Sequence, residues 1–391
     1  MAGITGLGTT YNLPNYTGVL HQLSPTATPF YSAIGGLSGG GQTTSTEFEW
    51  ETVDLRAPGQ NVALEGAAAP TAQSRVRANV TNVVEIHQEK VAVSYTKLAA
   101  YGQKNGTNND ASNPITNETD FQVRTMLTQM VRDVNWGFWN GKYVKPSDNA
   151  TARQTRGLLQ AITTNRQAAT GSLSYTGFTS ATDTITGTHA LTAGDKVIFD
   201  TVGAAAIVPG RVYFVASVST TVSFKIAATS GGSALTVGTG TGISFRKATA
   251  TALTKGVVNG LAQLVYDNGG INDQLTGVFA VNSAQKVALS GAFGSQFQEN
   301  SRSVGGVNIS TVITDFGELG IMLDRAIPQD TISLVSLAEC SPVYLEVPGK
   351  GHFFAEPLAK TGSADEVMLY GEVGLSYGAE SSHGVINGLA V

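Results

Sequence analysis

Residues 44–55 and 84–95 alternate apolar and polar positions with a period of two, which predicts two β-strands. The first strand has an aromatic face and an acidic face, which are Phe48 and Trp50, and Glu47, Glu49 and Glu51. Between the strands, residues 56–79 are rich in Ala, Pro, Gly and Gln and offer almost nothing to form a core. Since a two-stranded ribbon is only marginally stable alone, residues 44–97 are expected to form an extended hairpin loop that packs against another molecule.

A long amphipathic helix is predicted over residues 117–140. Its apolar positions recur at steps of three and four, at Val123, Leu127, Met130, Val131, Val134 and Phe138. Asn117 is a natural N-cap with Asp120 in the capping-box position, and Asn140-Gly141 is a stop signal. At about 1.5 Å per residue the helix would measure roughly 36 Å, which is typical of a structural spine.

Residues 166–250 differ in composition, because Thr, Ser, Gly, Ala and Val dominate and charged residues are fewer than elsewhere. Short alternating runs separated by turn signals predict strands at 184–186, 196–199, 212–218, 222–226 and 243–245. Strands at this spacing predict a small β-sandwich or barrel. Since helical patterns flank the segment on both sides, the module is expected to be inserted into a host domain.

The later sequence predicts helices and strands that segregate rather than alternate. Helices are predicted at 255–268 and 283–289, and strands at 278–281, 307–314, 320–323, 332–335, 343–347, 367–370 and 373–377. The predicted fold class is therefore α+β with an all-β insertion domain.

Residues 1–43 are predicted to form an extended N-terminal arm. Pro14, Pro25 and Pro29 disfavour a helix, and clustered glycines follow them. Irregularly spaced apolar residues would anchor the arm to a surface, namely Tyr11, Tyr16, Phe30, Tyr31 and Ile34. This surface is expected to belong to a neighbouring molecule rather than to the arm's own domain.

The composition favours an ordered protein that assembles. Hydrophobic residues make up 41% of the chain and charged residues only 14%, which suits flat subunit contacts better than a free monomer. A net charge of −5 gives no basic patch, so contact with DNA is expected to be weak. The sequence has no apolar run long enough to span a membrane and no signal-peptide pattern, so synthesis in a reducing cytoplasm is expected.

No catalytic, cofactor or metal site is predicted. The single cysteine, Cys340, and the scattered histidines form no ligand cluster. The glycine motifs at 36–40, 238–242 and 349–352 lack the flanking elements of a hydrolase elbow or a phosphate loop and are interpreted as arm, strand and turn segments.

The three glutamates of the predicted first strand are interpreted as a solvated face. Two alternatives are cation binding and pairing with Arg75 and Arg77 of a neighbouring hairpin. Of these two, the charge pairing is the more useful hypothesis.

The order of arm, hairpin loop, spine helix, α+β middle and strand-rich end resembles the major capsid proteins of tailed double-stranded DNA phages, which have the Hong Kong 97-type fold. Short phrases strengthen the resemblance, namely Thr28-Pro29-Phe30, Phe48-Glu49-Trp50, Leu64-Glu65-Gly66, Gly157-Leu158-Leu159 and Val281-Asn282-Ser283-Ala284-Gln285-Lys286. The resemblance covers residues 20–165 and 253–391 and leaves the β module outside.

The resemblance implies a peripheral domain of residues 98–165 with 340–391, and an axial domain of residues 251–339. It also implies that residues 44–97 overlap the adjacent subunit, with Phe48, Trp50, the three glutamates, Arg75 and Arg77 as candidate intersubunit contacts. Some relatives join this loop to a neighbour through a Lys–Asn isopeptide bond. Residues 56–89 contain no lysine, so a shell without covalent cross-links is expected.

The implied function is structural. Subunits would close into pentamers and hexamers that form an icosahedral shell around phage DNA, in a virion made in the host bacterial cytoplasm. Implied partners are other copies of the chain, separate scaffolding and portal proteins, and optionally a decoration protein; the module would project outward, with weak glycan binding as an alternative role. Two alternatives are an encapsulin that encloses cargo enzymes, and a tail or adhesion protein that carries a β module.

Overall fold

The computed structural model describes residues 22–99, 117–203, 205–249, 251–271, 277–293, 297–304, 307–359 and 362–391. The predicted anchors Tyr11 and Tyr16 lie outside the described residues. The chain divides into two compact units. The described part of the smaller unit is residues 22–27, 86–99, 117–133, 347–359 and 362–371; the larger unit holds the rest.

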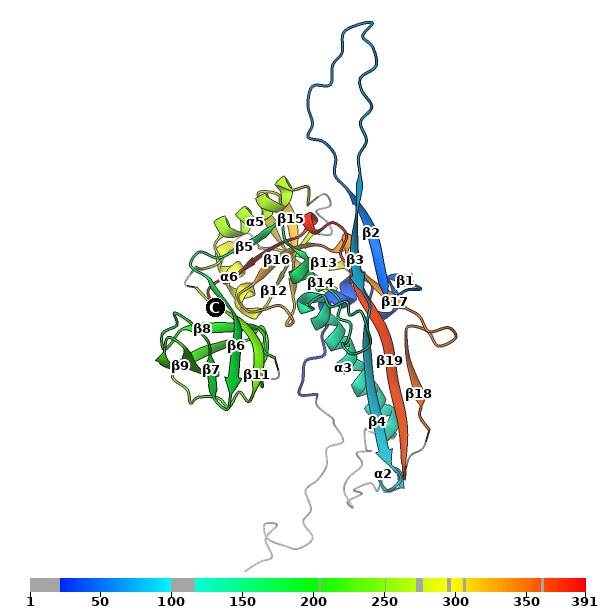
Figure 1. Ribbon diagram of the computed structural model, residues 1–391, viewed down its shortest axis with the longest axis vertical. Helices are drawn as coiled ribbons and strands as arrows, with labels where there is room; N and C mark the ends of the chain where they lie inside the picture. Colours follow the sequence, from blue (N-terminus) through cyan, green and yellow to red (C-terminus); the bar gives the residue numbers. More distant parts are fainter. Residues whose placement is uncertain are drawn as a thin grey trace, which may run out of the picture. The chain divides into compact units, whose positions relative to one another are not determined.

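The smaller unit combines a sheet with most of the spine helix (Figure 1). Its elements are β4 (Glu85–Ser94), α2 (Tyr95–Ala99), β18 (Phe353–Pro357), the first part of β19 (Ala364–Ser376) and the first part of α3 (Glu118–Asn140). Strand β19 pairs antiparallel with β18 and also pairs with β4. The predicted N-cap of α3 is confirmed, because Asn117 Oδ1 accepts hydrogen bonds from the backbone N–H groups of Thr119 at 3.0 Å and Asp120 at 3.3 Å.

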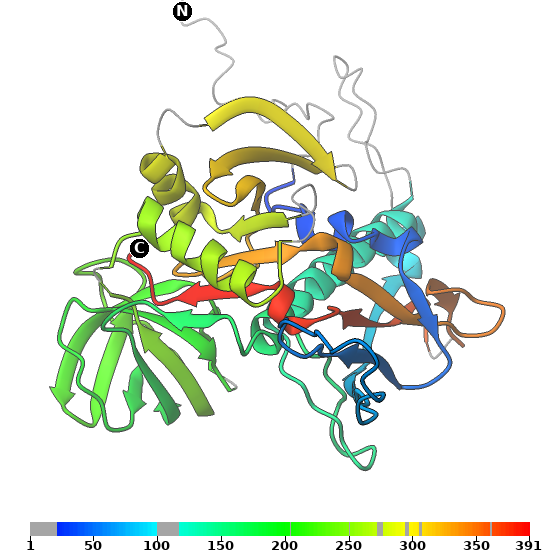
Figure 2. The same cartoon turned by 90° about the horizontal axis from the view of Figure 1, so that it is seen from above.

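The larger unit is built on a seven-stranded sheet with the strand order β13-β14-β15-β12-β16-β20-β5. These strands are β5 (Arg166–Ala168), β12 (Gly277–Val281), β13 (Phe297–Val304), β14 (Val307–Thr314), β15 (Gly317–Leu323), β16 (Ile332–Ser336) and β20 (Gly384–Asn387). Helices α5 (Lys255–Asp267) and α6 (Ser283–Phe293) lie against this sheet (Figure 2). Their apolar faces bury Val258, Leu261 and Leu289 against Phe279 and Leu334, which forms the core of the unit.

The β module is a closed six-stranded barrel with the order β10-β7-β6-β11-β8-β9. Its strands are β6 (Leu173–Ala181), β7 (Thr184–Thr186), β8 (Lys196–Thr201), β9 (Val212–Thr220), β10 (Ser223–Ala227) and β11 (Gly240–Lys247). Of the two predicted alternatives, a small β-sandwich or a barrel, the structure has the barrel, but the predicted start at residue 166 is wrong. Residues 166–168 form β5, which pairs in parallel with β20 of the host sheet.

The barrel closes around an aromatic core. The rings of Phe178, Phe199 and Phe224 each lie within 6.3 Å of another core ring, centroid to centroid, and Phe245 contacts all three. All four side chains are at most 3% exposed. The inserted module therefore has its own core and does not depend on the host sheet to bury its apolar residues.

The end of the predicted arm lies on its own chain, which corrects the expectation of a neighbouring molecule for this part. Pro29 occupies the first turn of α1 (Pro29–Ala33) rather than preventing a helix, since proline is well tolerated there. Phe30 and Tyr31 are buried, and the hydroxyls of Tyr31 and Tyr344 lie 2.6 Å apart. After the short helix η1 (Gly36–Ser38), β1 (Gly41–Thr43) pairs in parallel with β17 (Ser341–Leu345).

Candidate functional site: the β2–β3 hairpin and the barrel junction

The hairpin forms between β2 (Glu47–Val53) and β3 (Arg77–Val83), with registers from Glu47↔Val83 to Val53↔Arg77. The predicted strand at 84–95 exists as β4 (Glu85–Ser94), but the prediction that it pairs with the first strand of the hairpin is wrong, because β4 pairs with β19. The two consecutive residues Val83 and Val84 are both buried, at 1% and 0% exposure. Two adjacent buried side chains break the alternation of a strand, so the chain changes sheets at this point.

The aromatic face of β2 anchors the hairpin to its own chain. Trp50 Nε1 donates a hydrogen bond to the carbonyl oxygen of Gly378 at 2.8 Å, and its ring meets the edge of Tyr377 at 4.9 Å. Phe48 approaches the backbone of Gly374 so closely that a Cβ there would lie 2.6 Å from the ring. Phe48 and Trp50, which were candidate intersubunit contacts, thus fix the root of the hairpin within the subunit.

The acidic face has polar partners within its own chain. Arg77 binds Glu51 at 2.5 Å and Lys145 binds Glu47 at 2.6 Å, while Asn79 donates to Glu49 at 3.3 Å. The partners are largely exposed, so each ion pair contributes little to stability. Arg75 has no ion pair with any residue that the structure describes.

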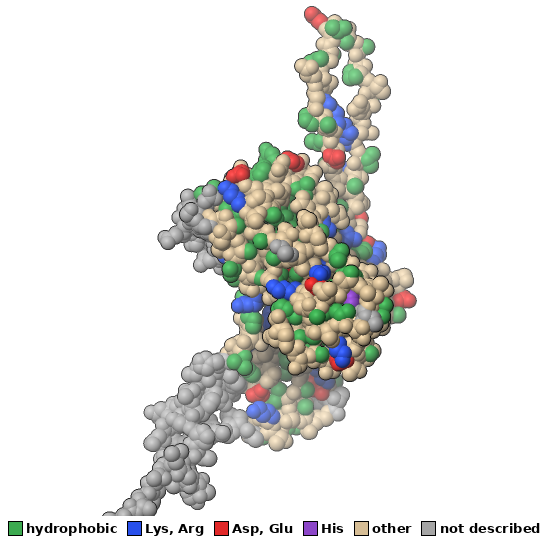
Figure 3. Space-filling model, turned by 90° about the vertical axis from the view of Figure 1, so that its left-hand side faces the viewer, with side chains coloured by type: hydrophobic (Ala, Val, Ile, Leu, Met, Phe, Trp, Pro, Cys, Tyr) green, Lys and Arg blue, Asp and Glu red, His purple; other side chains and the backbone are tan. Residues whose placement is uncertain are grey.

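The tip of the hairpin, residues 54–76, contains no strand or helix, and every residue in it is exposed. Its only described backbone turn is the hydrogen bond from Ala67 N–H to the carbonyl oxygen of Leu64 at 3.1 Å. Four large apolar side chains in the tip are between 76% and 85% exposed, namely Leu55, Val62, Leu64 and Val76. Figure 3 shows hydrophobic side chains along the whole projecting tip. Four exposed large apolar side chains with no packing partner among the residues that the structure describes indicate an interface.

Asn82 supports the root and was not identified from the sequence. It is fully buried, donates to the carbonyl oxygen of Leu375 at 2.7 Å and accepts from the backbone N–H of Arg156 at 2.8 Å. The sequence does contain a sign of this role, because Asn82 lies between Val80 and Val83 of β3, where a strand that enters a core would be expected to carry an apolar residue.

His383 lies buried close to the residues that hold Trp50. Its Nδ1 accepts a hydrogen bond from the backbone N–H of Ser336 at 3.2 Å, so Nε2 carries the proton and donates to the carbonyl oxygen of Tyr377 at 2.8 Å. Burial lowers the pKa of His383, although the Tyr377 carbonyl and the charges of Glu339 and Glu380 oppose this effect.

The free energy of unfolding is expected to fall as the pH decreases below about 6.5, the usual pKa of histidine in an unfolded chain. In that range the unfolded chain binds a proton on His383 more readily than the folded chain does, and stability above it is unaffected. Urea unfolding at several pH values would measure the slope. His383→Gln is expected to flatten it, and the same slope in that variant would contradict the assignment.

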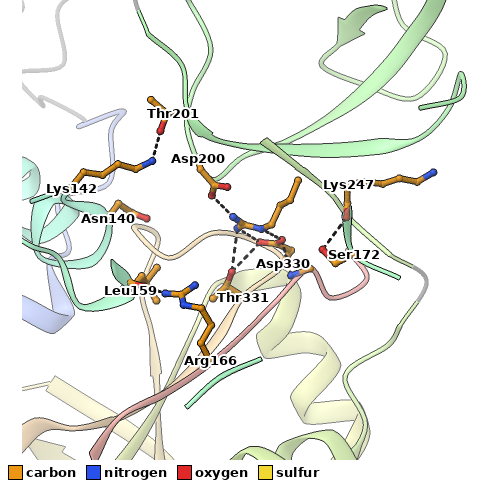
Figure 4. Close-up of polar contacts among 12 residues, drawn as sticks. Asn140, Lys142, Leu159, Arg166, Ser172, Asp200, Thr201, Lys247, Asp330 and Thr331 are labelled. Carbon is orange, nitrogen blue, oxygen red and sulfur yellow. Dashed lines mark hydrogen bonds and ion pairs between the residues drawn. The ribbon is translucent and has the colours of Figure 1, made fainter. Parts of the chain in front are cut away.

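A second candidate site is the junction between the barrel and the host sheet (Figure 4). Arg246 of β11 is 5% exposed and forms ion pairs with Asp330 and Asp200. Its Nη2 lies 2.7 Å from Asp330 Oδ1, and Asp330 Oδ2 also accepts from the backbone N–H of Gly388 at 3.0 Å. Burial would lower the pKa of Arg246, but the two carboxylates more than reverse this and raise it. The junction is therefore a buried, satisfied charge cluster.

The remaining predicted features bear on chemistry. Within the described residues, no three His, Cys, Asp or Glu side chains group as metal ligands, and no helix is long and apolar enough to cross a membrane. The glycine motif at 36–40 includes the short helix η1, and the motif at 349–352 forms a turn closed by the hydrogen bond from Lys350 N–H to the Val347 carbonyl.

The projecting hairpin, the long α3 helix and the mixed sheets define a capsid shell protein of the Hong Kong 97-type fold. Residues 3–390 match the family model described as SU10 major capsid protein, and the chain belongs to this family. This is a structural family and not a class of enzymes. No curated protein sequence matches the chain.

Two solved structures illustrate the fold. The chain is similar to the capsid protein of cyanophage A-1(L), with 11% identity, coverage of 99% of this chain and 100% of that chain, and a TM-score of 0.56. It is also similar to the holo-SrpI encapsulin complex from Synechococcus elongatus PCC 7942, with 9% identity, coverage of 96% and 93%, and a TM-score of 0.50. At these identities the likeness concerns the fold alone.

Proposed function

We propose that this capsid protein assembles into pentamers and hexamers that close an icosahedral shell around double-stranded DNA, with the hairpin tip lying on the adjacent subunit. The observation that carries this proposal is the exposed tip, residues 54–76, with its four large apolar side chains. The root of the hairpin is fixed to its own chain through Trp50, so the tip is presented outward from a firm base. The hairpin tip would then act as a strap, which is the name used below for residues 54–76 in contact with an adjacent subunit. Such a strap holds a neighbour without requiring a large flat interface.

Contacts between subunits in this shell are non-covalent. Residues 56–89 contain no lysine, and Lys90 is engaged in an ion pair with Glu366 at 2.7 Å. Each subunit would receive several neighbours at once, so avidity rather than one strong contact stabilises the shell. Separate scaffolding and portal proteins are part of the proposal, and the net charge of −5 favours weak contact between the wall and the packaged DNA.

Particles purified from infected cells are expected to show a portal vertex and DNA by electron microscopy. After boiling in denaturant they are expected to give a single chain of 40.6 kDa on a gel. A ladder of multimers would contradict the non-covalent contacts. Small closed shells with enclosed protein and no portal would instead favour an encapsulin, whose fold the chain shares.

The alternative of a tail or adhesion protein has lost its support. Its basis was the β module, which many structural proteins could carry. The family match covers residues 3–390 and so includes the module together with the hairpin and spine.

A further inference from the structure

An open cleft with a volume of about 570 Å³ lies between the barrel and the host part of the larger unit. The host side contributes Asn140, Lys142, Gln160 and Arg166, and the barrel side contributes Ser244 and Asp200. Ligand sites in proteins commonly have volumes of about 300–1,000 Å³ and combine an apolar wall with a few convergent polar groups. The size and lining of this cleft fit that description.

The charges in the cleft are not balanced. Both carboxylates of the junction, Asp200 and Asp330, bind Arg246. Lys142 binds only the hydroxyl of Thr201, and Arg166 binds only the carbonyl oxygens of Leu159 and Ile162, among the residues that the structure describes (Figure 4). Two cations therefore border the cleft without a carboxylate partner.

Both cations keep donors to spare. A guanidinium group has five N–H donors, and the Ile162 and Leu159 carbonyls use two of those on Arg166. An ammonium group has three donors, and Thr201 uses one of those on Lys142. Partial burial and then the positive charge of Arg246 lower the pKa of Arg166, and Asp200 opposes this only in part. Burial is the larger cause of this shift, and a bound anion would offset both the burial and the repulsion from Arg246.

We propose that this cleft binds a small molecule about the size of a sugar phosphate or sugar acid, whose phosphate or carboxylate group is held by Arg166, with Lys142 as a second cation of the cleft lining. The planar donor fork of Arg166 suits two oxygens of such a group, and Lys142 supplies a second positive charge. Hydroxyl and amide groups at Ser244, Asn140 and Gln160 provide contacts for the polar remainder of the ligand. This is a binding function in addition to shell formation.

Isothermal titration of the full-length protein with inorganic phosphate, glucose 6-phosphate and glucuronate, at constant ionic strength, tests the site. Binding of the phosphates alone would identify a phosphate site, and binding of glucuronate alone a carboxylate site. Glucose and added chloride are the controls and are expected to give no saturable heat. No saturable binding of any of the three anions would overturn the proposal.

Variants assign the binding to the cleft. Lys142→Met and Arg166→Gln are each expected to weaken binding about tenfold or more, because each removes a charged hydrogen bond. Arg211→Gln removes an exposed cation outside the cleft and is expected to bind normally. Equal weakening by Arg211→Gln would show general screening and overturn the proposal. Arg166→Lys retains the charge, so partial binding by it separates loss of the ligand contact from misfolding.

The outcome is independent of shell formation. Neither Lys142 nor Arg166 belongs to the hairpin tip, so both variants are expected to form particles visible by electron microscopy. If the protein forms normal particles but binds no anion, the proposed cleft site is wrong and the proposed shell function stands. If it binds the anion but forms no particles, the shell function is wrong and the cleft site stands.

Discussion

Shells are expected to be absent when residues 54–76 are replaced by Asn-Gly, and the protein is expected to remain as folded monomers or isolated capsomers. Asn-Gly forms the two-residue turn that suits an antiparallel hairpin. The seven β2–β3 residue pairs and the Trp50 hydrogen bond to Gly378 remain, so the subunit itself should keep its fold. Size-exclusion chromatography and electron microscopy would give the assembly state, and circular dichroism the fold.

The physical reason is the loss of the apolar tip. Burying one Val or Leu side chain completely is worth about 1.5–3 kcal/mol, and ordering the segment offsets part of that gain. A deletion of residues 57–78, which lie within the span 56–79 that the sequence places between the two strands, would also remove Arg77 and Ala78, which pair with Val53 and Thr52. The narrower replacement therefore tests the strap without damaging the strand that presents it.

A full-length variant separates the apolar contacts from the length of the loop. Changing the four exposed residues, Leu55, Val62, Leu64 and Val76, to serine is expected to abolish or strongly reduce shell formation. Changing two polar tip residues, Gln60 and Gln73, to serine is the matched control and is expected to assemble normally. Intact shells from the four-residue variant or from the Asn-Gly replacement would contradict the proposed role of the tip in holding the adjacent subunit.

Local patterns were sufficient for the elements in which period and capping agree. The alternation of residues 47–53 and the three- and four-residue steps after Asn117 predict β2 and α3 correctly. Strand β6 was missed, because its sequence is polar, several of its side chains are exposed, and Gly177 adopts a positive φ within it. Such a strand carries little of the alternation that sequence reasoning requires.

The partners of these elements could not be predicted in the same way. Trp50 and Gly378 are 328 residues apart in the sequence. The sequence alone does not distinguish an intersubunit contact of the Trp50 ring from a contact within the subunit. The two strands predicted at 367–370 and 373–377 are instead the single strand β19. Gly371 and Gly374 lie within β19, and the rings of Phe353 and Phe48 pack directly over them, where a larger side chain would clash. In the sequence alone these two glycines indicate only turns.

The barrel junction illustrates the same limit for charges. Arg246 and Asp330 are 84 residues apart and lie in a module and a host that the sequence treats as separate. The charged residues between residues 166 and 250 are informative in retrospect, because Arg246 and Asp200 both lie at the junction. The composition alone does not predict which carboxylates form ion pairs with Arg246.

Arg246→Met is expected to lower the free energy of unfolding by about 3–5 kcal/mol, which is the usual cost of leaving one member of a buried ion pair uncompensated. Asp330 is completely buried, so its charge would keep only hydrogen bonds such as that from Gly388 N–H. Urea unfolding would measure the loss. Limited proteolysis is expected to open the connections at residues 169–172 and 248–253, because the barrel keeps its own aromatic core when it detaches.

A matched exposed pair sets the scale for this effect. Lys225→Met breaks the ion pair between Lys225 and Asp183. These two side chains are 39% and 33% exposed, so the change is expected to lower the free energy of unfolding far less than Arg246→Met does. The double variant Arg246→Met with Asp330→Asn removes both buried charges and is expected to recover part of the stability lost in Arg246→Met alone. If Arg246→Met cost no more than Lys225→Met, the buried cluster would not be what docks the barrel on the host sheet. Backbone contacts between the barrel and the host, such as the hydrogen bond from Gln329 N–H to the carbonyl oxygen of Gly210 at 3.1 Å, would then hold the junction.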